Sequence, residues 1–345
     1  MKKVLITYCA ILLGIAAHSQ LIPNLGGQRA GSSTLSFLKA DVSPRSVGMG
    51  GSSVAFDKSG YSLANNPAPI VDLENLTFAI SDRVYGEGMH QTFLSGIYPV
   101  NEGGSLGFLV NSLTSGEMEV RTEFKPKGNG RKFYVNNSAF GVSYSQKFSD
   151  RFNAGVTLKY IYEKLDKYTN HTAAFDLGFL YKTDMKDLKF SVVVKNFGIN
   201  SSLNGSFIQE EFNRTTGIST ENFSIPTVFK IGVSMKPYIK DDQSLLVSAQ
   251  LNHPNDNAEN IRIGAEYQYL DMLYGRLGYM INIEGQTFPT LGIGYKTTVG
   301  RFPLTFDYSI EPTDFLGTLH QIGFIFSITD KVKQSSGKSE TENGK

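Results

Sequence analysis

The sequence predicts an all-β fold: a transmembrane antiparallel β-barrel of about 14 strands with an N-terminal segment inside the lumen. Three observations support this prediction. Segments of about ten residues alternate between apolar and polar side chains, the connections between them are alternately short and long, and the chain is rich in Phe, Tyr and Gly, with 24, 17 and 35 copies.

Residues 260–284 show the alternation most clearly. Apolar side chains occupy every second position from Ile261 to Tyr269, with polar residues or glycine between them, and a second alternating run extends from Leu273 to Ile283. A period of two is that of a β-strand. Strands of a soluble sandwich usually have about five or six residues, whereas about ten tilted residues cross a bilayer. The hairpin therefore favours a membrane barrel.

The same unit recurs along the chain. Strands are expected at residues 73–81, 92–100, 105–113, 139–148, 152–165, 172–183, 188–198, 227–238, 244–252, 260–269, 273–283, 287–298, 302–310 and 319–328. Long connections at residues 114–137 and 199–225 contrast with short turns such as 149–151. Short turns of bacterial barrels face the periplasm and long loops face outward, which predicts that both termini lie in the periplasm.

Four regions are expected along the chain. Residues 1–19 have the basic start, apolar run and small residues of a secretory signal peptide, so the mature chain is expected to begin at Gln20. Residues 20–72 are glycine-containing and non-strand, and we expect them to form a plug or hatch in the lumen. Residues 73–328 form the barrel, and residues 329–345 are a polar tail that we expect to be disordered. The only cysteine, Cys9, lies in the signal, so the mature chain is expected to have no disulfide.

Composition and motifs favour a protein that is not an enzyme. A formal net charge of +1 and the lack of a basic stripe argue against a nucleic-acid partner. No Gly-x-Ser-x-Gly nucleophile motif occurs. The five histidines have no paired ligand spacing, so neither a metal site nor a cofactor is expected.

Charged residues at inward positions of the predicted strands form a candidate lumenal network. Its members are Lys159, Asp176, Arg262, Glu266, Arg276 and Asp307. They either line an open channel or form a hydrogen-bonded network that fills the lumen and holds the N-terminal segment, and we prefer the second interpretation.

The N-terminal segment contains a glycine-rich motif. It consists of Arg45, Gly48, Met49, Gly50 and Gly51, with Asn66, Pro67 and Ala68 downstream. The Lys-Ser/Thr of a phosphate-binding loop is missing, so we interpret the glycines as positions where the backbone packs closely inside the lumen.

This motif and several strand segments resemble the PorV/PorQ family of Bacteroidetes outer-membrane proteins, which is itself similar to FadL-type barrels. The strand segments are 154–161, 175–178, 195–198, 264–267 and 276–279. The resemblance implies a non-enzymatic role in type IX protein secretion, with outer-membrane lipid around the barrel. Its protein partners would be the translocon, an attachment complex or the signal domains of secreted cargo. The alternative is a FadL-like channel for hydrophobic small molecules, with the N-terminal segment as a movable hatch.

Overall fold

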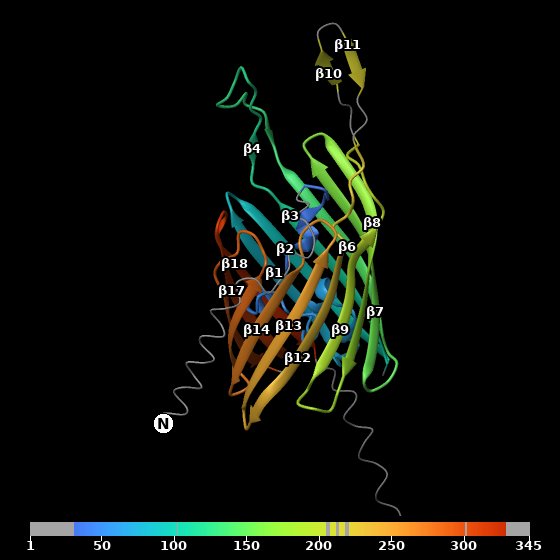
Figure 1. Cartoon of the computed structure of the whole chain (residues 1–345), viewed down its shortest axis with the longest axis vertical. Coiled ribbons are helices and arrows are strands. Elements are labelled where there is room, and N and C mark those ends of the chain that lie inside the picture. Colours follow the sequence, from blue (N-terminus) through green and yellow to red (C-terminus); the bar gives the residue numbers. More distant parts are fainter. Residues whose placement is uncertain are drawn as a thin grey trace, which may run out of the picture.

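The structure, a computed structural model, describes residues 31–101, 103–204, 208–211, 214–217, 221–300 and 302–328. The predicted signal peptide and polar tail lie outside these residues. Within them, fourteen antiparallel strands form a closed barrel, so the predicted fold class is confirmed (Figure 1).

Each strand of the barrel pairs with its neighbours along the chain, and β1 closes the ring by pairing with β18. The barrel strands are β1 Leu76–Gly86, β2 Met89–Asn101, β3 Gly104–Thr114, β6 Val135–Lys147, β7 Phe152–Leu165, β8 Tyr168–Lys182, β9 Lys189–Gly198, β12 Val228–Lys240, β13 Gln243–Pro254, β14 Asn260–Tyr269, β15 Leu273–Ile281, β16 Thr290–Val299, β17 Phe302–Thr313 and β18 Gly317–Ile328. Two short strand pairs project beyond the end of the barrel that carries the long loops (Figure 1). They are β4 Met118–Glu119 with β5 Lys132–Phe133, and β10 Ile208–Glu211 with β11 Arg214–Gly217.

All fourteen predicted strands are present, with differences at their ends. Several extend further toward the long loops than predicted: β1 runs to Gly86 and β8 begins at Tyr168. The backbone ladder continues there beyond the apolar alternation that marked the predicted limits. The strand register leaves residues 270–272 between the paired Tyr269 and Leu273 of the hairpin β14–β15. In this tight turn, Leu270 and Asp271 have positive φ values of 53° and 52°.

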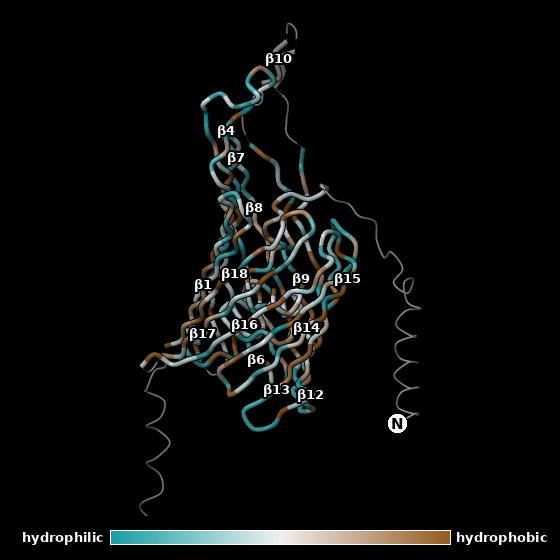
Figure 2. Tube along the Cα trace, turned by 90° about the vertical axis from the view of Figure 1, so that its left-hand side faces the viewer, coloured by the Kyte–Doolittle hydropathy of each residue, from teal (hydrophilic) through white to brown (hydrophobic). Residues whose placement is uncertain are grey.

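The outward faces of the strands are largely apolar, whereas many inward positions carry small or polar side chains. On β12, Phe229 and Ile231 are exposed on the outside, whereas Lys230 between them is buried in the lumen. Figure 2 shows hydrophobic segments along the barrel strands and hydrophilic stretches in the projecting part near β4. Among the described helices, none is long and apolar enough to cross a membrane.

Residues 33–75 run through the lumen, and we call them the plug. The plug contains η1 Ser36–Lys39, α2 Pro44–Gly48, α3 Ser62–Asn65 and η2 Ala68–Asp72. It begins at the long-loop end, where the backbone N–H of Thr34 donates to the carbonyl of Ser224, and reaches the short-turn end just before β1. The orientation predicted for the chain termini concerns residues outside the described part and stays a prediction.

The plug supplies much of the buried apolar core. Tyr61 and Leu63 of the plug pack with Phe93, Ile97 and other wall residues in one cluster. The Tyr61 hydroxyl also donates to the carbonyls of Ile80 in β1 and Phe324 in β18, at 2.7 and 3.1 Å. The plug therefore contacts the two strands that close the ring.

Candidate functional site

Ion pairs join the plug to the barrel wall at three levels of the lumen. Near the long loops, Lys39 Nζ lies 2.7 Å from Asp256. In the middle, Arg45 Nη2 lies 2.6 Å from Glu266. Toward the short turns, Asp72 accepts from Lys182 Nζ at 2.6 Å. These contacts hold the plug against three different parts of the wall.

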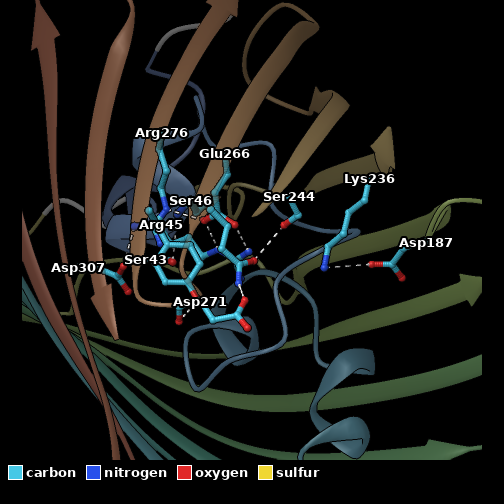
Figure 3. A network of polar contacts seen from close by, with 12 residues as sticks. Ser43, Arg45, Ser46, Asp187, Lys236, Ser244, Glu266, Asp271, Arg276 and Asp307 are labelled. Atoms are coloured by element: carbon cyan, nitrogen blue, oxygen red, sulfur yellow. Dashed lines mark hydrogen bonds and ion pairs between the residues drawn. The ribbon is translucent and has the colours of Figure 1, made fainter. Parts of the chain in front are cut away.

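The middle level is a four-residue ion-pair chain, which we call the Arg45 latch (Figure 3). Arg45 donates to both carboxylate oxygens of Glu266, at 2.8 and 2.6 Å. Glu266 also accepts from Arg276 Nε at 2.6 Å, and Arg276 Nη1 donates to Asp307 at 2.6 Å. The side chains of Glu266, Arg276 and Asp307 are buried. Two cations therefore balance two anions, an arrangement that offsets the cost of burying charge.

Local sequence orients Arg45 toward the wall. Ser43 caps α2 by accepting the backbone N–H of Ser46 at 3.2 Å, and Pro44 takes the first helical position, where no N–H is needed. Asp41 accepts from the backbone N–H of Ser43, the Ser46 hydroxyl and the Asn65 amide, which joins α2 to α3. Arg45 therefore projects from a fixed turn.

Inward-facing glycines of the wall admit the plug at close range. A side-chain carbon built on Gly278 would lie 1.9 Å from the backbone N of Gly50, and one on Gly264 would lie 2.5 Å from the carbonyl O of Met49. We call this set the glycine belt. Its members are Gly107, Gly155, Gly178, Gly232, Gly264, Gly278, Gly292 and Gly323. Each lies on a different strand, so the plug is closely fitted around the lumen.

The structure places the glycine motif at this belt. Gly48 packs against Gly292, Gly50 against the backbone of Tyr279, and Gly51 beside the guanidinium of Arg262. Gly50 and Gly51 have φ values of 68° and 76°, a region that glycine adopts without strain.

The downstream residues of the motif contact the opposite part of the wall. The Asn66 amide donates to Ser191 Oγ of β9 at 2.8 Å, and the Ala68 carbonyl accepts from Ser145 Oγ of β6 at 2.9 Å. Pro67 packs on Gly155 of β7. The two halves of the motif are therefore attached to opposite sides of the ring.

The predicted lumenal network divides into separate groups. Glu266, Arg276 and Asp307 belong to the latch. Lys159 pairs with Asp176 at 2.7 Å and also donates to Asn196, whose backbone N–H donates to Asp176 at 2.7 Å. Arg262 joins neither group: its Nε donates to Asn260 Oδ1 at 3.1 Å.

Two cavities at the long-loop end meet above the plug, and we call them together the mouth cavity. Their volumes are about 410 and 460 Å³, and both are lined by Lys39, Arg262, Ile283, Glu284 and Phe315. The second also has an apolar side formed by Val47, Met280, Leu316 and Leu319. Further cavities of about 390 and 270 Å³ lie at the short-turn end, so the plug separates open space at the two ends.

Sequence reasoning missed several of these residues. The belt glycines lie at inward positions of strands whose side chains alternate between apolar and polar. Their inward position in this alternation could have identified them as residues that face the plug. Lys39, Asp72 and Asp256 gave no signal, because they lie in loops or non-strand segments where no period defines a face. No group of His, Cys, Asp and Glu within the described part of the chain could hold a metal ion.

Asp57 is a buried residue of the plug, and its carboxyl group lines the cavity of about 390 Å³ at the short-turn end. Burial raises its pKa to about 6, although the positive charge of Arg45 acts in the opposite direction. The ionised form is therefore disfavoured in the folded protein.

This raised pKa predicts a pH-dependent stability. Because the folded pKa exceeds the unfolded value of 3.8, stability falls as pH rises from about 4 to about 6, by about 3 kcal/mol. Asp57→Asn should remove this component and stabilise the protein at pH 8. Guanidinium unfolding in detergent measures the pH dependence of stability in the parent and in the variant. Unfolding is followed by Tyr fluorescence because the chain has no Trp. An identical pH profile in the variant and the parent would contradict the assignment.

Solved structures of transport barrels share this fold. A FadL homologue of Pseudomonas aeruginosa aligns with a TM-score of 0.51 and 13% identity, over 86% of this chain and 98% of that one. The Ralstonia pickettii toluene transporter TbuX aligns with a TM-score of 0.52 and 14% identity, over 82% of this chain and 96% of that one. The P. putida toluene transporter TodX aligns with a TM-score of 0.52 and 10% identity, over 84% of this chain and 98% of that one. No protein-family model matches the chain, and no curated protein matches it.

The chain therefore has the fold of FadL-type β-barrels. The neighbours themselves are described as toluene transporters or as a FadL homologue.

Proposed function

We propose that this protein is an outer-membrane channel for small hydrophobic molecules, with the plug as its gate. The observation that carries the proposal is the mouth cavity, whose apolar side is formed by Met280, Ile283, Phe315, Leu316 and Leu319 directly above the plug. Apolar pockets with a few polar groups are typical sites for small ligands. The two toluene transporters with this fold support the same substrate class.

Passage requires the plug to move, because it fills the middle of the lumen. The contacts that hold it are polar and reversible: the Arg45 latch, the Lys39–Asp256 pair and the Asp72–Lys182 pair. A shift of the plug away from one part of the wall would connect the mouth cavity with the cavities at the short-turn end.

Dye uptake by cells tests this proposal. N-phenyl-1-naphthylamine fluoresces when it enters an apolar phase, and an intact outer membrane excludes it. Cells that make the barrel should take it up several-fold faster than cells with an empty vector. The matched control is the barrel with Phe315→Asp and Leu316→Asp, which removes apolar lining from the mouth. Equal rates in all three strains would contradict a channel for hydrophobic molecules.

A role in type IX protein secretion is a second candidate, favoured by the parts that project beyond the barrel. The β4–β5 hairpin extends outward, and Phe124 between its strands is 95% exposed. Mass spectrometry of proteins that co-purify with the tagged barrel in mild detergent tests this candidate. Translocon or cargo proteins in the eluate, lost when residues 118–133 are replaced by a short Gly-Ser linker, would support it. A barrel that is always isolated alone would exclude it.

A further inference from the structure

Three polar side chains meet on the lumenal face of the wall where β7, β8 and β9 run side by side. Lys159 Nζ lies 2.7 Å from Asp176 Oδ1 and also donates to Oδ1 of Asn196. All three residues are buried: Lys159 is 7% exposed, Asp176 1% and Asn196 0%. An amine, a carboxyl group and a primary amide therefore lie together away from water.

A β-bulge brings the amide into this group. The register of β8 and β9 shifts at Asp176, and Asn196 on the facing strand has a φ of 56°. A bulge redirects side chains, and the successive residues Lys195 and Asn196 are both buried. The backbone N–H of Asn196 donates to Asp176 Oδ1 at 2.7 Å, and its Nδ2 donates to the carbonyl of Pro226 at 3.2 Å. The oxygen of the side-chain amide is therefore fixed toward Lys159.

The surroundings of the group suit chemistry between uncharged partners. Lys159 and Asp176 line a small internal cavity together with apolar side chains that include Phe93 and Leu109. Transfer of one proton along the hydrogen bond from Lys159 to Asp176 gives an amine and a carboxylic acid, and it removes two buried charges. An amine with a free electron pair is a nucleophile, and a carboxylic acid in contact with it can carry protons.

We propose that Lys159 and Asn196 form an intramolecular isopeptide bond, with Asp176 as the catalytic proton carrier. Asp176 takes one proton from the Lys159 ammonium, and Nζ attacks the side-chain carbonyl carbon of Asn196. Asp176 then gives this proton to Nδ2 and accepts a second proton from Nζ. The bond between the carbonyl carbon and Nδ2 breaks, and ammonia leaves. The product is a secondary amide that joins β7 to β9 across β8.

This bond would close residues 159–196 into a covalent loop. A cross-link restricts the unfolded chain, so it stabilises the folded barrel. The loop includes wall that packs on the plug, because Ile161 and Ala174 belong to the same buried cluster as Phe37 and Leu38. Formation of the bond needs neither a ligand nor movement of the plug, so it does not depend on the proposed channel function.

Peptide mass spectrometry of the full barrel, purified from membranes, denatured and digested with trypsin, tests the bond. We expect a branched peptide made of residues 152–164 and 196–214, lighter than the sum of the two by one ammonia. Most of the folded protein should contain it. Chains kept in urea should contain none, because only the fold brings the groups together. Unlinked peptides alone from the folded barrel would overturn the proposal, as would a branch to residues 168–182, which contain Asp176.

Variants test the role of each group at a fixed time after refolding. Lys159→Arg should abolish the branched peptide, and Asp176→Asn should lower its yield at least about tenfold. Lys195→Met is the matched control: it replaces another buried lysine of the same cavity and should keep the bond, with residues 190–214 as the second arm. Circular dichroism in detergent establishes that each variant forms strands. A parental yield in folded Asp176→Asn would contradict proton transfer by Asp176, and if a variant does not fold, the peptides of the parent decide.

Discussion

Gly278→Ala is expected to displace the plug and to lower the free energy of unfolding by about 3 kcal/mol or more. The new methyl carbon would lie 1.9 Å from the backbone N of Gly50 and 2.2 Å from the carbonyl carbon of Met49. These are backbone atoms, so no side-chain rotation relieves the clash. Gly50 is held there by hydrogen bonds to Val47 and Thr290, and the whole turn after α2 must shift.

Gly275→Ala on the same strand is the matched control. Nothing lies within 4 Å of the carbon that this substitution adds. Guanidinium unfolding in detergent compares the two variants, and trypsin cleavage at Arg45 reports exposure of the plug. The close fit of plug and wall predicts that Gly278→Ala is destabilised and readily cleaved, whereas Gly275→Ala behaves as the parent. Parental behaviour of both variants would show that the wall does not hold the plug.

Glu266→Gln is expected to have a comparably large effect, because it breaks the Arg45 latch. Arg45 and Arg276 would then remain next to each other in the lumen with Asp307 as the one remaining carboxylate of the latch. Removing one partner of a buried ion pair costs about 3–5 kcal/mol. We expect a loss of this size in the free energy of unfolding, together with faster dye uptake by cells.

A second substitution tests whether charge imbalance causes the loss. Glu266→Gln combined with Arg45→Met leaves one cation and one anion, Arg276 and Asp307, so it should recover a large part of the stability. Glu123→Gln, in the exposed connection between β4 and β5, is the control for the same chemical change. If the double variant lost more unfolding free energy than the two single variants lose in total, the latch would not act as one charge-balanced unit.

Alternation of side chains predicted the barrel because lipid on one side and the plug on the other impose opposite requirements on successive residues. Phe229 and Ile231 face lipid while Lys230 faces the lumen, and this pattern can be recognised without a structure. The same argument placed Glu266, Arg276 and Asp307 at inward positions. Strand count and strand order followed from local sequence because antiparallel neighbours are consecutive in the chain.

Partnerships inside the lumen could not be predicted in the same way. Arg45 pairs with Glu266 across 221 positions of sequence, and not with another inward residue, because the turn after Ser43 aims it there. Arg262 also faces the lumen, but it lines the mouth cavity at the long-loop end and does not belong to the latch. Depth in the barrel depends on strand tilt and register, which alternation alone does not give.

The movable plug is the central claim, and a disulfide that locks it to the wall tests it most directly. Ser52 Oγ of the plug and Ser248 Oγ of β13 lie 2.6 Å apart, so Ser52→Cys with Ser248→Cys places two thiols in bonding range, and residues 20–345 contain no other cysteine. The same protein can then be compared oxidised and reduced in the dye-uptake assay. We predict that oxidation lowers uptake at least about tenfold and that reduction restores it. Equal uptake in both states would show that molecules do not pass by movement of the plug.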